Sequence, residues 1–513
     1  MNLIEHLELR SKQHPEQVAL VDVDTQLSYA ELYQRVSGGS QKLRKDGLIA
    51  GDCVLLLLPV SVELYVGFLS ILHSGMTVML LDPSAGKKAI IQSLKTVKVK
   101  ACIGIPKAQL LRLLNSEVRS IEKHYSTSTW VPFTRHWSPS VQCPEAPAEV
   151  LPEHPALITF TSGSTGKPKA ACRTHGFLLA QHAALSESLE YREGEVDLIT
   201  LPVFAISNLA SGLTSVIANT DLRTPGNVSA DAVLAQCKQW KVTRCAASPA
   251  FFQSLLESDK LPPFEAIYTG GAPVFPHVLE KLQAKLPQAK VVTVFGSTEA
   301  EPISHCLWST TTELEKSRMA SGAGLLVGKP VSATQLRVIS DQSSESIPSL
   351  TVDEFDTMNL PSSSVGEIVV TGEHVLKSYL HGSGDEEAKF SVEGIIWHRT
   401  GDAASIDADG QVWMLGRCKA AVTAKNGDKI YPFGIECTAM QQPNIQRCAL
   451  VSHQGQVTLC YQGTLTSTEQ DTLLEQLKHL LVEQLKQLDH IPVDKRHNAK
   501  IDYPSLKQLL KEK

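Results

Sequence analysis

Short apolar runs alternate with amphipathic stretches through roughly the first 300 residues of the chain. The apolar runs have the length of buried strands and lie at residues 18–23, 54–58, 78–81 and 101–105. Two longer stretches, residues 29–45 and 62–73, repeat their apolar positions with the period of a helix. Strands that alternate with helices predict βαβ units, and therefore largely parallel sheets covered by helices.

The pattern changes after about residue 417. Apolar runs at residues 448–451 and 457–461 flank Gly455 and predict an antiparallel hairpin. A helix is expected next, starting near Ser467, with its leucines at positions 473, 474, 477, 481, 485 and 488. Such a stripe more often lies on the domain's own sheet than forms a dimerising coil. Because 513 residues exceed one hydrophobic core, we expect an α/β protein with a large domain, residues 1–416, and a small α+β domain, residues 418–513.

Residues 159–169 form the most informative segment, Thr-Phe-Thr-Ser-Gly-Ser-Thr-Gly-Lys-Pro-Lys. The segment follows an apolar run at 156–158 and precedes a helical stretch at 174–189. A turn of this kind offers hydroxyls, backbone N–H groups and cations to a polyphosphate. A flexible Gly/Ser linker is the alternative, and the Lys-Pro-Lys ending and β-branched start argue against it.

The spacing excludes the commonest phosphate loop. A P-loop needs four residues between its first glycine and the Gly-Lys-Ser/Thr triplet. Here two residues separate Gly163 from Gly166, and Pro168 follows Lys167. A nucleotide kinase or ATPase of the P-loop kind is therefore not predicted from this segment.

The segment resembles the signature loop of the adenylate-forming superfamily, which contains acyl-CoA synthetases, peptide-synthetase adenylation domains and luciferases. Ala170 stands where that family usually has glycine. The resemblance implies ATP as the bound nucleotide and a small domain that moves as a lid. It assigns to nucleotide binding Thr161, Ser162, Gly163, Ser164, Thr165, Gly166 and Lys169.

A second motif, Phe-Gly-Ser-Thr-Glu at residues 295–299, follows an expected strand at residues 291–294. A glycine lets the backbone approach a nucleotide, and a carboxylate at a strand's end can hold Mg²⁺ against phosphate oxygens. By itself Glu299 would more often be a surface carboxylate. The motif is similar to the family's Tyr-Gly-x-Thr-Glu, which implies a contact of Thr298 with the α-phosphate and of Glu299 with magnesium. The motif also assigns to the nucleotide site Phe295, Gly296 and Ser297.

Two further segments carry the remaining polar chemistry. Asp402 ends a Thr-Gly-Asp sequence, and a carboxylate suits the two hydroxyls of a ribose; a turn aspartate is the plain alternative. The resemblance implies that Asp402 binds the ribose with help from Arg417, and that Lys419 is the interdomain hinge. Lys500 occupies the family's catalytic position, although Ala499 replaces the usual glycine. Most basic C-terminal segments are simply solvated, whereas a lysine on a mobile domain can stabilise transition-state charge.

The segment at residues 201–208 indicates which class of carboxylic acid the enzyme activates. Amino-acid-activating relatives usually have an aspartate after phenylalanine, but here Ala205 follows Phe204. Alanine cannot neutralise an ammonium group, whose unpaired burial is costly, so an uncharged aliphatic acid is the simplest interpretation. The resemblance assigns to the acyl pocket Phe204, Ala205, Ile206 and Gly270, and to the nucleotide site Gly271 and Ala272.

Finer similarity points to the olefin-pathway β-lactone synthetases. It rests on residues 204–205, 397–402, 436–437 and 496–501. The implied reaction forms acyl-AMP from a 3-hydroxy fatty acid, whose own hydroxyl then closes a β-lactone. Residues 418–421, Cys-Lys-Ala-Ala, depart from that subgroup and leave CoA or an acyl carrier protein open as the acceptor. A catalytically inactive nucleotide-binding protein is the third hypothesis, and it is disfavoured by the presence of Lys169, Glu299, Asp402 and Lys500.

Composition narrows the remaining classes. A formal net charge of −6 does not favour nucleic acid as a partner. The apolar runs are too short to span a bilayer, so an integral membrane protein is not expected. The 11 cysteines show no paired metal-ligand spacing, and the early acidic residues Glu5 and Glu8 do not resemble a secretory signal. We expect a cytoplasmic ligase that uses ATP, Mg²⁺ and a carboxylic acid.

Overall fold

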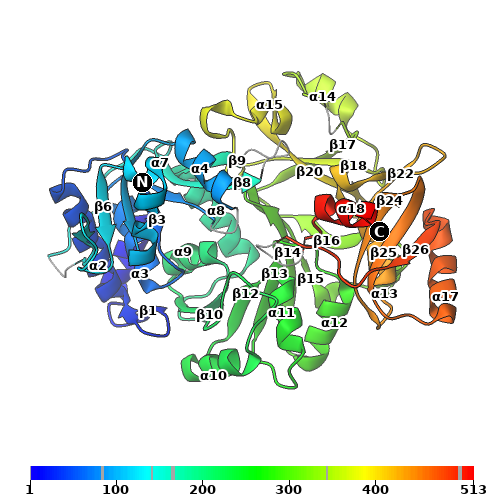
Figure 1. The fold of residues 1–513 in the computed structure, drawn as a ribbon, viewed down its shortest axis with the longest axis horizontal. Coiled ribbons are helices and arrows are strands. Elements are labelled where there is room, and N and C mark those ends of the chain that lie inside the picture. Colours follow the sequence, from blue (N-terminus) through cyan, green and yellow to red (C-terminus); the bar gives the residue numbers. More distant parts are fainter. Residues whose placement is uncertain are drawn as a thin grey trace.

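The computed structural model describes residues 2–82, 86–139, 143–162, 168–342, 345–494 and 500–512. Its described part contains sheets of fourteen, seven, three and two strands. Figure 1 shows the N-terminal elements at one end, the large sheet in the middle and the C-terminal elements at the other end.

The seven-stranded sheet is parallel except at its last pair, β8 and β9. Its strands, in spatial order, are β7 (Arg135–His136), β6 (Lys123–Ser126), β5 (Val99–Gly104), β3 (Cys53–Leu57), β4 (Thr77–Leu80), β8 (Pro155–Ser162) and β9 (Pro168–Thr174). Residues 159–162 of the proposed phosphate loop lie on β8 and residues 168–169 lie on β9, so the loop joins two antiparallel strands.

The fourteen-stranded sheet changes character along its width. Its first part is parallel apart from the edge pair β1–β2, in the order β2 (Gln26–Ser28), β1 (Val18–Val21), β11 (Thr214–Ile217), β10 (Val196–Ile199), β12 (Arg244–Ala247), β13 (Ala266–Gly270) and β14 (Lys290–Ser297). Its second part is antiparallel, in the order β15 (Ala300–Leu307), β16 (Leu325–Pro330), β21 (Val412–Arg417), β20 (Ile395–Ile406), β18 (Gly366–Thr371) and β17 (Gln335–Ile339), with β19 (Lys389–Val392) beside β20. Helix-covered parallel sheets are thus present as expected, and the antiparallel half was not foreseen.

Side-chain caps fix where several of the covering helices begin. Ser28 caps α2 (Tyr29–Lys45) in a capping box with Glu31, and Ser61 caps α3 (Val62–His73). Thr174 caps α8 (His175–Ser188) directly after β9. The other helices of this part are α1 (Ile4–Gln13), α4 (Lys87–Thr96), α5 (Pro106–Gln109), α6 (Leu111–Leu114), α7 (Ser116–Arg119), α9 (Pro202–Ser211), α10 (Ala230–Trp240), α11 (Pro249–Leu256), α12 (Pro276–Lys285), α13 (Glu313–Ala320), α14 (Val352–Met358) and α15 (Asp385–Ala388).

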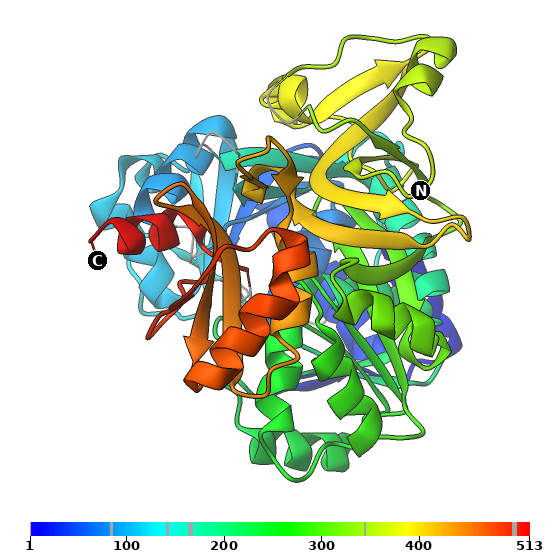
Figure 2. The ribbon, with the colours of Figure 1, turned by 90° about the vertical axis from the view of Figure 1, so that its right-hand side faces the viewer.

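The C-terminal elements form a layer of their own, seen from its side in Figure 2. The strands β24 (Ile445–His453), β25 (Gln456–Gly463) and β26 (Gln484–Gln487) make a sheet between two helical layers. Alternate residues of β24 point to opposite faces, so one face packs on α16 (Pro432–Ala439) and α17 (Ser467–Leu477). The other face packs on α18 (Tyr503–Glu512). A two-stranded ribbon, β22 (Val422–Thr423) and β23 (Lys429–Ile430), precedes α16.

Polar contacts join this layer to the rest of the chain. Thr438 Oγ1 and Gln441 Nε2 donate to the carbonyl of Ala320, at 3.0 and 2.8 Å. Tyr431 OH and Lys429 Nζ both reach Asp341 Oδ2, at 3.0 and 2.8 Å. Polar contacts such as these are typical of interdomain surfaces.

The single long leucine helix expected after the hairpin is wrong. Helix α17 begins after Thr466, which caps it in a capping box with Glu469, and ends at Leu477. Leu481 has a left-handed backbone (φ +64°), which stops a helix. Leu485 then lies on β26, which pairs in parallel with β25. The leucines that were expected on one helix therefore belong to different elements, a helix and a strand.

Candidate active site

Part of the phosphate-loop motif lies outside the described residues, namely Gly163, Ser164, Thr165, Gly166 and Lys167, and so does the side chain of Ser162. The two ends of the motif are described: Thr161 lies on β8 and Lys169 on β9. The Lys169 ammonium is buried and donates to Gly384 O at 3.2 Å and to Glu387 Oε2 at 3.1 Å. It also lies 5.3 Å from the centre of the Tyr379 ring.

Glu299 lies in the turn between β14 and β15 and its side chain is buried. Tyr379 donates its hydroxyl to Glu299 Oε1 at 2.7 Å. Burial raises the pKa of Glu299, but His398, the Tyr379 hydroxyl and Lys389 oppose it and leave the pKa below its ordinary value. The turn therefore holds a carboxylate that the protein keeps ionised.

Lys389 and His398 surround this carboxylate, and sequence reasoning did not assign either of them. Lys389 starts β19, is buried, and donates to the carbonyl of Leu376. Burial lowers its pKa to about 8, partly opposed by Glu299 and Asp385. Burial, with the nearby Lys389 ammonium, lowers the pKa of His398 to about 3. His398 belongs to the segment 397–402, which contributes to the resemblance to β-lactone synthetases. Lys389 lies in no motif that was identified from the sequence.

Tyr379 and Arg173 tie the two nucleotide motifs together. Tyr379 pairs with Ala171 of β9 in an isolated β-bridge, and its hydroxyl bonds with the Thr161 side chain as well as with Glu299. Arg173 donates to Thr159 Oγ1 at 3.1 Å and to Thr298 O at 2.9 Å. The ends of the segment 159–169 and the Thr298–Glu299 turn are thus adjacent, although Lys169 and Glu299 are 130 positions apart in the sequence.

Glycines let neighbouring strands meet at this edge of the sheet. A Cβ on Gly270, at the end of β13, would lie 2.2 Å from the carbonyl oxygen of Val294 on β14. Gly271 has a φ of +76° and no atom within 4 Å of where its Cβ would be, and Ala272 follows it half-buried. Phe295, Gly296 and Ser297 complete β14, and the buried Ser297 Oγ has no hydrogen-bond partner among the described residues.

Asp402 and Arg417 face each other across two paired strands. Asp402 lies on β20 and Arg417 on β21, directly opposite in the register. Arg417 Nη1 donates to Asp402 Oδ1 at 3.0 Å, and the carboxylate is buried whereas the arginine is exposed. The two residues chosen from the Thr-Gly-Asp and Gly-Arg sequences are therefore partners. Asp402 is part of a strand and not of a turn.

The AMP-binding enzyme family matches residues 7–380 of this chain. The chain belongs to this family. An olefin beta-lactone synthetase from Xanthomonas campestris pv. campestris is 28% identical over 490 residues, which cover 90% of this chain and 86% of that protein. The 4-coumarate-CoA ligase 1 of Narcissus pseudonarcissus is 26% identical over 459 residues, or 83% of this chain and 76% of the ligase. ATP-bound MatB from Rhodopseudomonas palustris superposes with a TM-score of 0.81 at 21% identity, over 100% of this chain and 99% of MatB.

The expected adenylate-forming enzyme, its fold and its resemblance to β-lactone synthetases are confirmed by these similarities. The family is described as AMP-binding, which agrees with the adenine nucleotide expected at this site. In the described part of the chain, no group of three or more His, Cys, Asp or Glu side chains could hold a metal ion. Mg²⁺ commonly binds through one or two carboxylates plus substrate phosphates, so the single buried carboxylate of Glu299 fits that ion.

Three of the four residues expected to line the acyl pocket lie on α9, and Gly270 ends β13. Ala205 is fully buried, Phe204 is buried, and Ile206 is half-buried against the same apolar cluster. Two buried polar residues also lie on α9: Ser207 Oγ is 2.8 Å from His182 Nδ1, and Asn208 donates to Asp197 Oδ2 at 2.7 Å. No charge of α9 could pair with an ammonium at Ala205.

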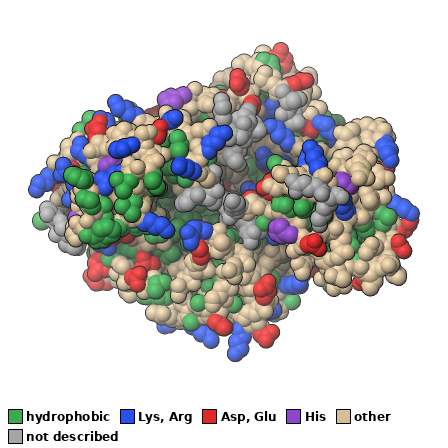
Figure 3. Space-filling model, in the orientation of Figure 1, with side chains coloured by type: hydrophobic (Ala, Val, Ile, Leu, Met, Phe, Trp, Pro, Cys, Tyr) green, Lys and Arg blue, Asp and Glu red, His purple; other side chains and the backbone are tan. Residues whose placement is uncertain are grey.

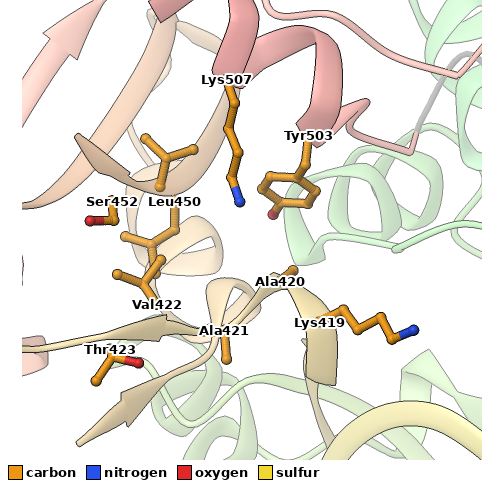
Figure 4. Close-up of a pocket in the computed structure, with 10 residues that line it drawn as sticks. Lys419, Ala420, Ala421, Val422, Thr423, Leu450, Ser452, Tyr503 and Lys507 are labelled. Atoms are coloured by element: carbon orange, nitrogen blue, oxygen red, sulfur yellow. The ribbon is translucent and has the colours of Figure 1, made fainter. Parts of the chain in front are cut away.

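The expected hinge and catalytic lysines both lie in the C-terminal region. Lys419 is part of a 3₁₀ turn (Cys418–Ala420) and lines a cavity of about 270 Å³ together with Tyr503 and Lys507. Figure 4 shows Tyr503 and Lys507 pointing toward Ala420, whereas the Lys419 side chain extends away. The main chain of Lys500 is held by Asp494, with the Lys500 N–H donating to Asp494 Oδ1 at 2.9 Å. The described part of the chain contains no helix with the length and apolar character needed to cross a bilayer.

Proposed function

We propose that this enzyme activates an aliphatic carboxylic acid, with a 3-hydroxy fatty acid as the preferred substrate, and closes it to a β-lactone. ATP is consumed, and pyrophosphate and then AMP are released. The observation that carries the proposal is the buried Glu299–Tyr379–Lys169 cluster, which joins a motif of the seven-stranded sheet to a motif of the fourteen-stranded sheet. The similarity to an olefin beta-lactone synthetase over 90% of the chain supports the second step.

In the first step the substrate carboxylate attacks the α-phosphorus of ATP. A new bond forms between carboxylate oxygen and phosphorus, and the bond from phosphorus to the bridging oxygen breaks, which releases pyrophosphate. We assign phosphate contacts to Thr161, Ser162, Gly163, Ser164, Thr165, Gly166, Lys169 and Thr298. Lys169 presents a buried ammonium for this task, now directed at Glu387.

Magnesium would be held by Glu299, where it would neutralise phosphate charge. The hydroxyl of Tyr379, which donates to Oε1 of this carboxylate, would orient it for that task. The remaining nucleotide contacts are assigned to Gly271, Ala272, Phe295, Gly296 and Ser297. Asp402 would bind the ribose hydroxyls with Arg417 beside it.

In the second step the 3-hydroxyl oxygen of the acyl-AMP attacks its own carbonyl carbon. The acyl carbon–phosphate oxygen bond breaks, AMP leaves, and the hydroxyl proton passes to solvent. The uncharged surroundings of Ala205 suit a fatty chain lined by Phe204, Ile206 and Gly270. Each buried methylene contributes about 0.8 kcal/mol, so affinity should rise roughly fourfold per carbon until the pocket ends.

We assign residues 1–416 to the nucleotide and acyl domain and residues 418–513 to a lid that turns about Lys419. Lys500, carried by the lid, would stabilise charge in the first transition state. The separate apolar clusters on the two faces of the C-terminal sheet support this division. A lid fixed so that Lys500 cannot reach the nucleotide would contradict it.

A thiol acceptor is the second candidate. The small side chains of Ala420 and Ala421 border the cavity beside Lys419, in the stretch where this chain departs from the β-lactone synthetase pattern. The similarity to a 4-coumarate-CoA ligase favours the same alternative. CoA or an acyl carrier protein would then take the acyl group.

One experiment separates these outcomes. The enzyme is incubated with ATP, Mg²⁺ and matched pairs of acids with and without a 3-hydroxyl, in the presence and absence of CoA, and products are identified by mass spectrometry. We expect β-lactone and AMP from the 3-hydroxy acid without CoA, and only acyl-AMP from its unsubstituted partner. If AMP is released only when CoA is present, the enzyme is a ligase that transfers the acyl group to a thiol. A preference for α-amino acids would contradict both proposals, and absence of pyrophosphate with every acid would indicate an inactive nucleotide-binding protein.

A further inference from the structure

The helical segment α5–α6 turns its apolar side chains toward solvent. Leu113 and Leu114 are each 75% exposed, and Leu110 and Leu111 are exposed as well. The residue of this segment that points inward is polar: Gln109 is only 1% exposed. A surface helix normally buries its leucines and exposes its glutamines, so this segment has the reverse pattern.

Gln109 fixes that orientation. Its Nε2 donates to the carbonyl of Tyr125 at 2.7 Å, and its Oε1 lies 3.1 Å from His124 Nδ1. Both partners belong to β6 of the seven-stranded sheet. A rotation that buried the leucines would break both bonds and leave a polar group unpaired in the interior, which is costly. The leucines are therefore held outward by the fold.

A loop beside the helix adds two exposed aromatic side chains. Trp130 is 66% exposed and Phe133 is 95% exposed. Arg112 of α6 donates to the carbonyls of Phe133 and Pro132, at 3.0 and 2.9 Å, so the loop is tied to the leucine segment. Val131 between the aromatics is buried and anchors the loop.

The backbone of Phe133 is held in the left-handed region, with a φ of +57°. That conformation is rare for a bulky residue and persists where the surrounding structure enforces it. Here the enforced conformation exposes the ring and does not bury it. The leucine–aromatic patch is defined as Leu110, Leu111, Leu113, Leu114, Trp130 and Phe133.

The region around the patch is basic, in a chain whose net charge is −6. Residues 99–139 contain two acidic side chains, Glu117 and Glu122, and each is paired with a lysine. The same residues contain six basic side chains, namely Lys100, Lys107, Arg112, Arg119, Lys123 and Arg135, of which Lys100 is paired with Glu122 and Arg135 with Asp46. Figure 3 shows hydrophobic side chains with Lys and Arg among them at this end of the molecule, where Figure 1 has β3 and β6.

We propose that the leucine–aromatic patch binds the surface of an anionic lipid bilayer. Leucine and aromatic rings suit insertion at the headgroup level, where tryptophan is enriched, and flanking Lys and Arg are attracted to anionic headgroups. Lys107 and Arg119 are exposed on either side of the leucines in sequence. The attachment is peripheral and does not depend on the proposed reaction. If that reaction is correct, the patch brings the enzyme to where fatty acids partition.

The full-length protein is mixed with vesicles of phosphatidylcholine alone, or of phosphatidylcholine with phosphatidylglycerol, and the bound fraction is measured by flotation. We expect binding to the mixed vesicles that weakens with added salt. W130S/F133S and, separately, L113S/L114S lower the partition coefficient about tenfold or more. K107Q/R119Q lowers it about tenfold on anionic vesicles only.

Leu314→Ser is the matched control, because Leu314 is 72% exposed on α13, away from the patch. It leaves binding unchanged. Trp130→Phe keeps the binding but removes the fluorescence quenching by brominated lipid that wild type shows. Absence of wild-type binding, or equal binding by W130S/F133S, overturns the proposal. The proposal is also overturned if the wild type does not bind vesicles but forms an oligomer that the W130S/F133S variant does not form. The patch would then be a protein interface.

Discussion

Two buried glutamates, one in each part of the molecule, behave in opposite ways. Glu299 in the proposed nucleotide site and Glu436 on α16 of the C-terminal layer are both buried. Burial raises the pKa of Glu436 to about 8, only partly opposed by bonds from the Leu450 N–H at 3.3 Å and the Tyr503 hydroxyl at 3.4 Å. The pKa of Glu299 is instead lowered, because His398, Tyr379 and Lys389 outweigh its burial.

The difference shows that burial alone does not make a carboxyl group catalytic. Glu436 is neutral near pH 7 and serves to join α16, β24 and α18. The Lys389 ammonium and the Tyr379 hydroxyl beside Glu299 favour its charged form, so a negative charge is held where the proposed dication would bind. The first arrangement stabilises a scaffold, and the second prepares a charge for a ligand.

The largest expected effect separates the two glutamates by activity. Glu299→Gln removes the charge proposed to hold magnesium, and we expect pyrophosphate release to fall by about two to three orders of magnitude. Glu436→Gln replaces a neutral acid by a neutral amide, and we expect a change within about twofold. Both variants are assayed with ATP, Mg²⁺ and a 3-hydroxy fatty acid, and circular dichroism checks that both fold. Equal losses in the two variants would remove the functional distinction between the sites.

The sequence predicted the local elements well where caps and periodicity agree. Helices α2 and α3 have the expected bounds because Ser28 and Ser61 cap them. The leucine helix failed, because apolar spacing cannot reveal that Leu481 adopts a left-handed backbone. The antiparallel half of the large sheet also escaped prediction, since strand order depends on contacts between distant segments.

The sequence motifs led to the candidate site residues, but they did not lead to the side chains that surround Glu299. Asp402 and Arg417, chosen from separate motifs, are hydrogen-bonded partners. Tyr379, Lys389 and His398 support Glu299 from a segment about 80 to 100 residues away in sequence. Nothing in the local pattern around Lys389 distinguishes it from a solvated lysine, because its burial is set by tertiary packing.

An intermediate effect concerns stability against pH. Between pH 4.5 and about 8, folded Glu436 holds a proton that the unfolded chain releases. Folding is therefore coupled to the uptake of one proton, and a rise in pH makes this uptake less favourable. The contribution of Glu436 to the free energy of unfolding consequently falls as pH rises through this window. The Glu436→Gln variant lacks this pH-dependent loss. Its free energy of unfolding, relative to that of the wild type, should therefore increase by about a few kcal/mol from the low-pH end to the high-pH end of the window. Denaturant midpoints of both proteins at several pH values measure it.

The matched control is Glu483→Gln, in the same layer. Glu483 accepts hydrogen bonds from Lys425 and from Val457 N–H, which lower its pKa below 4.5. It is ionised in both folded and unfolded chains above that pH, so the stability difference between Glu483→Gln and wild type should stay constant across the window. A constant difference for Glu436→Gln as well would mean that Glu436 is not protonated in the folded protein.

The smallest expected effect tests how Glu299 is held. Tyr379→Phe keeps the ring beside Lys169 and Lys389 but removes the hydroxyl that donates to Glu299 Oε1 at 2.7 Å. One lost hydrogen bond to a charged group costs about 1.5–3 kcal/mol at most, and the carboxylate is then free to turn. We expect the Mg²⁺ concentration for half-maximal pyrophosphate release to rise about three- to tenfold, with the maximal rate nearly unchanged. Tyr125→Phe is the control, because it removes a comparable bond, 3.0 Å to Asp46, far from the site. A shift of the same size in both variants would show that Tyr379 stabilises the fold and does not orient Glu299 for the ion.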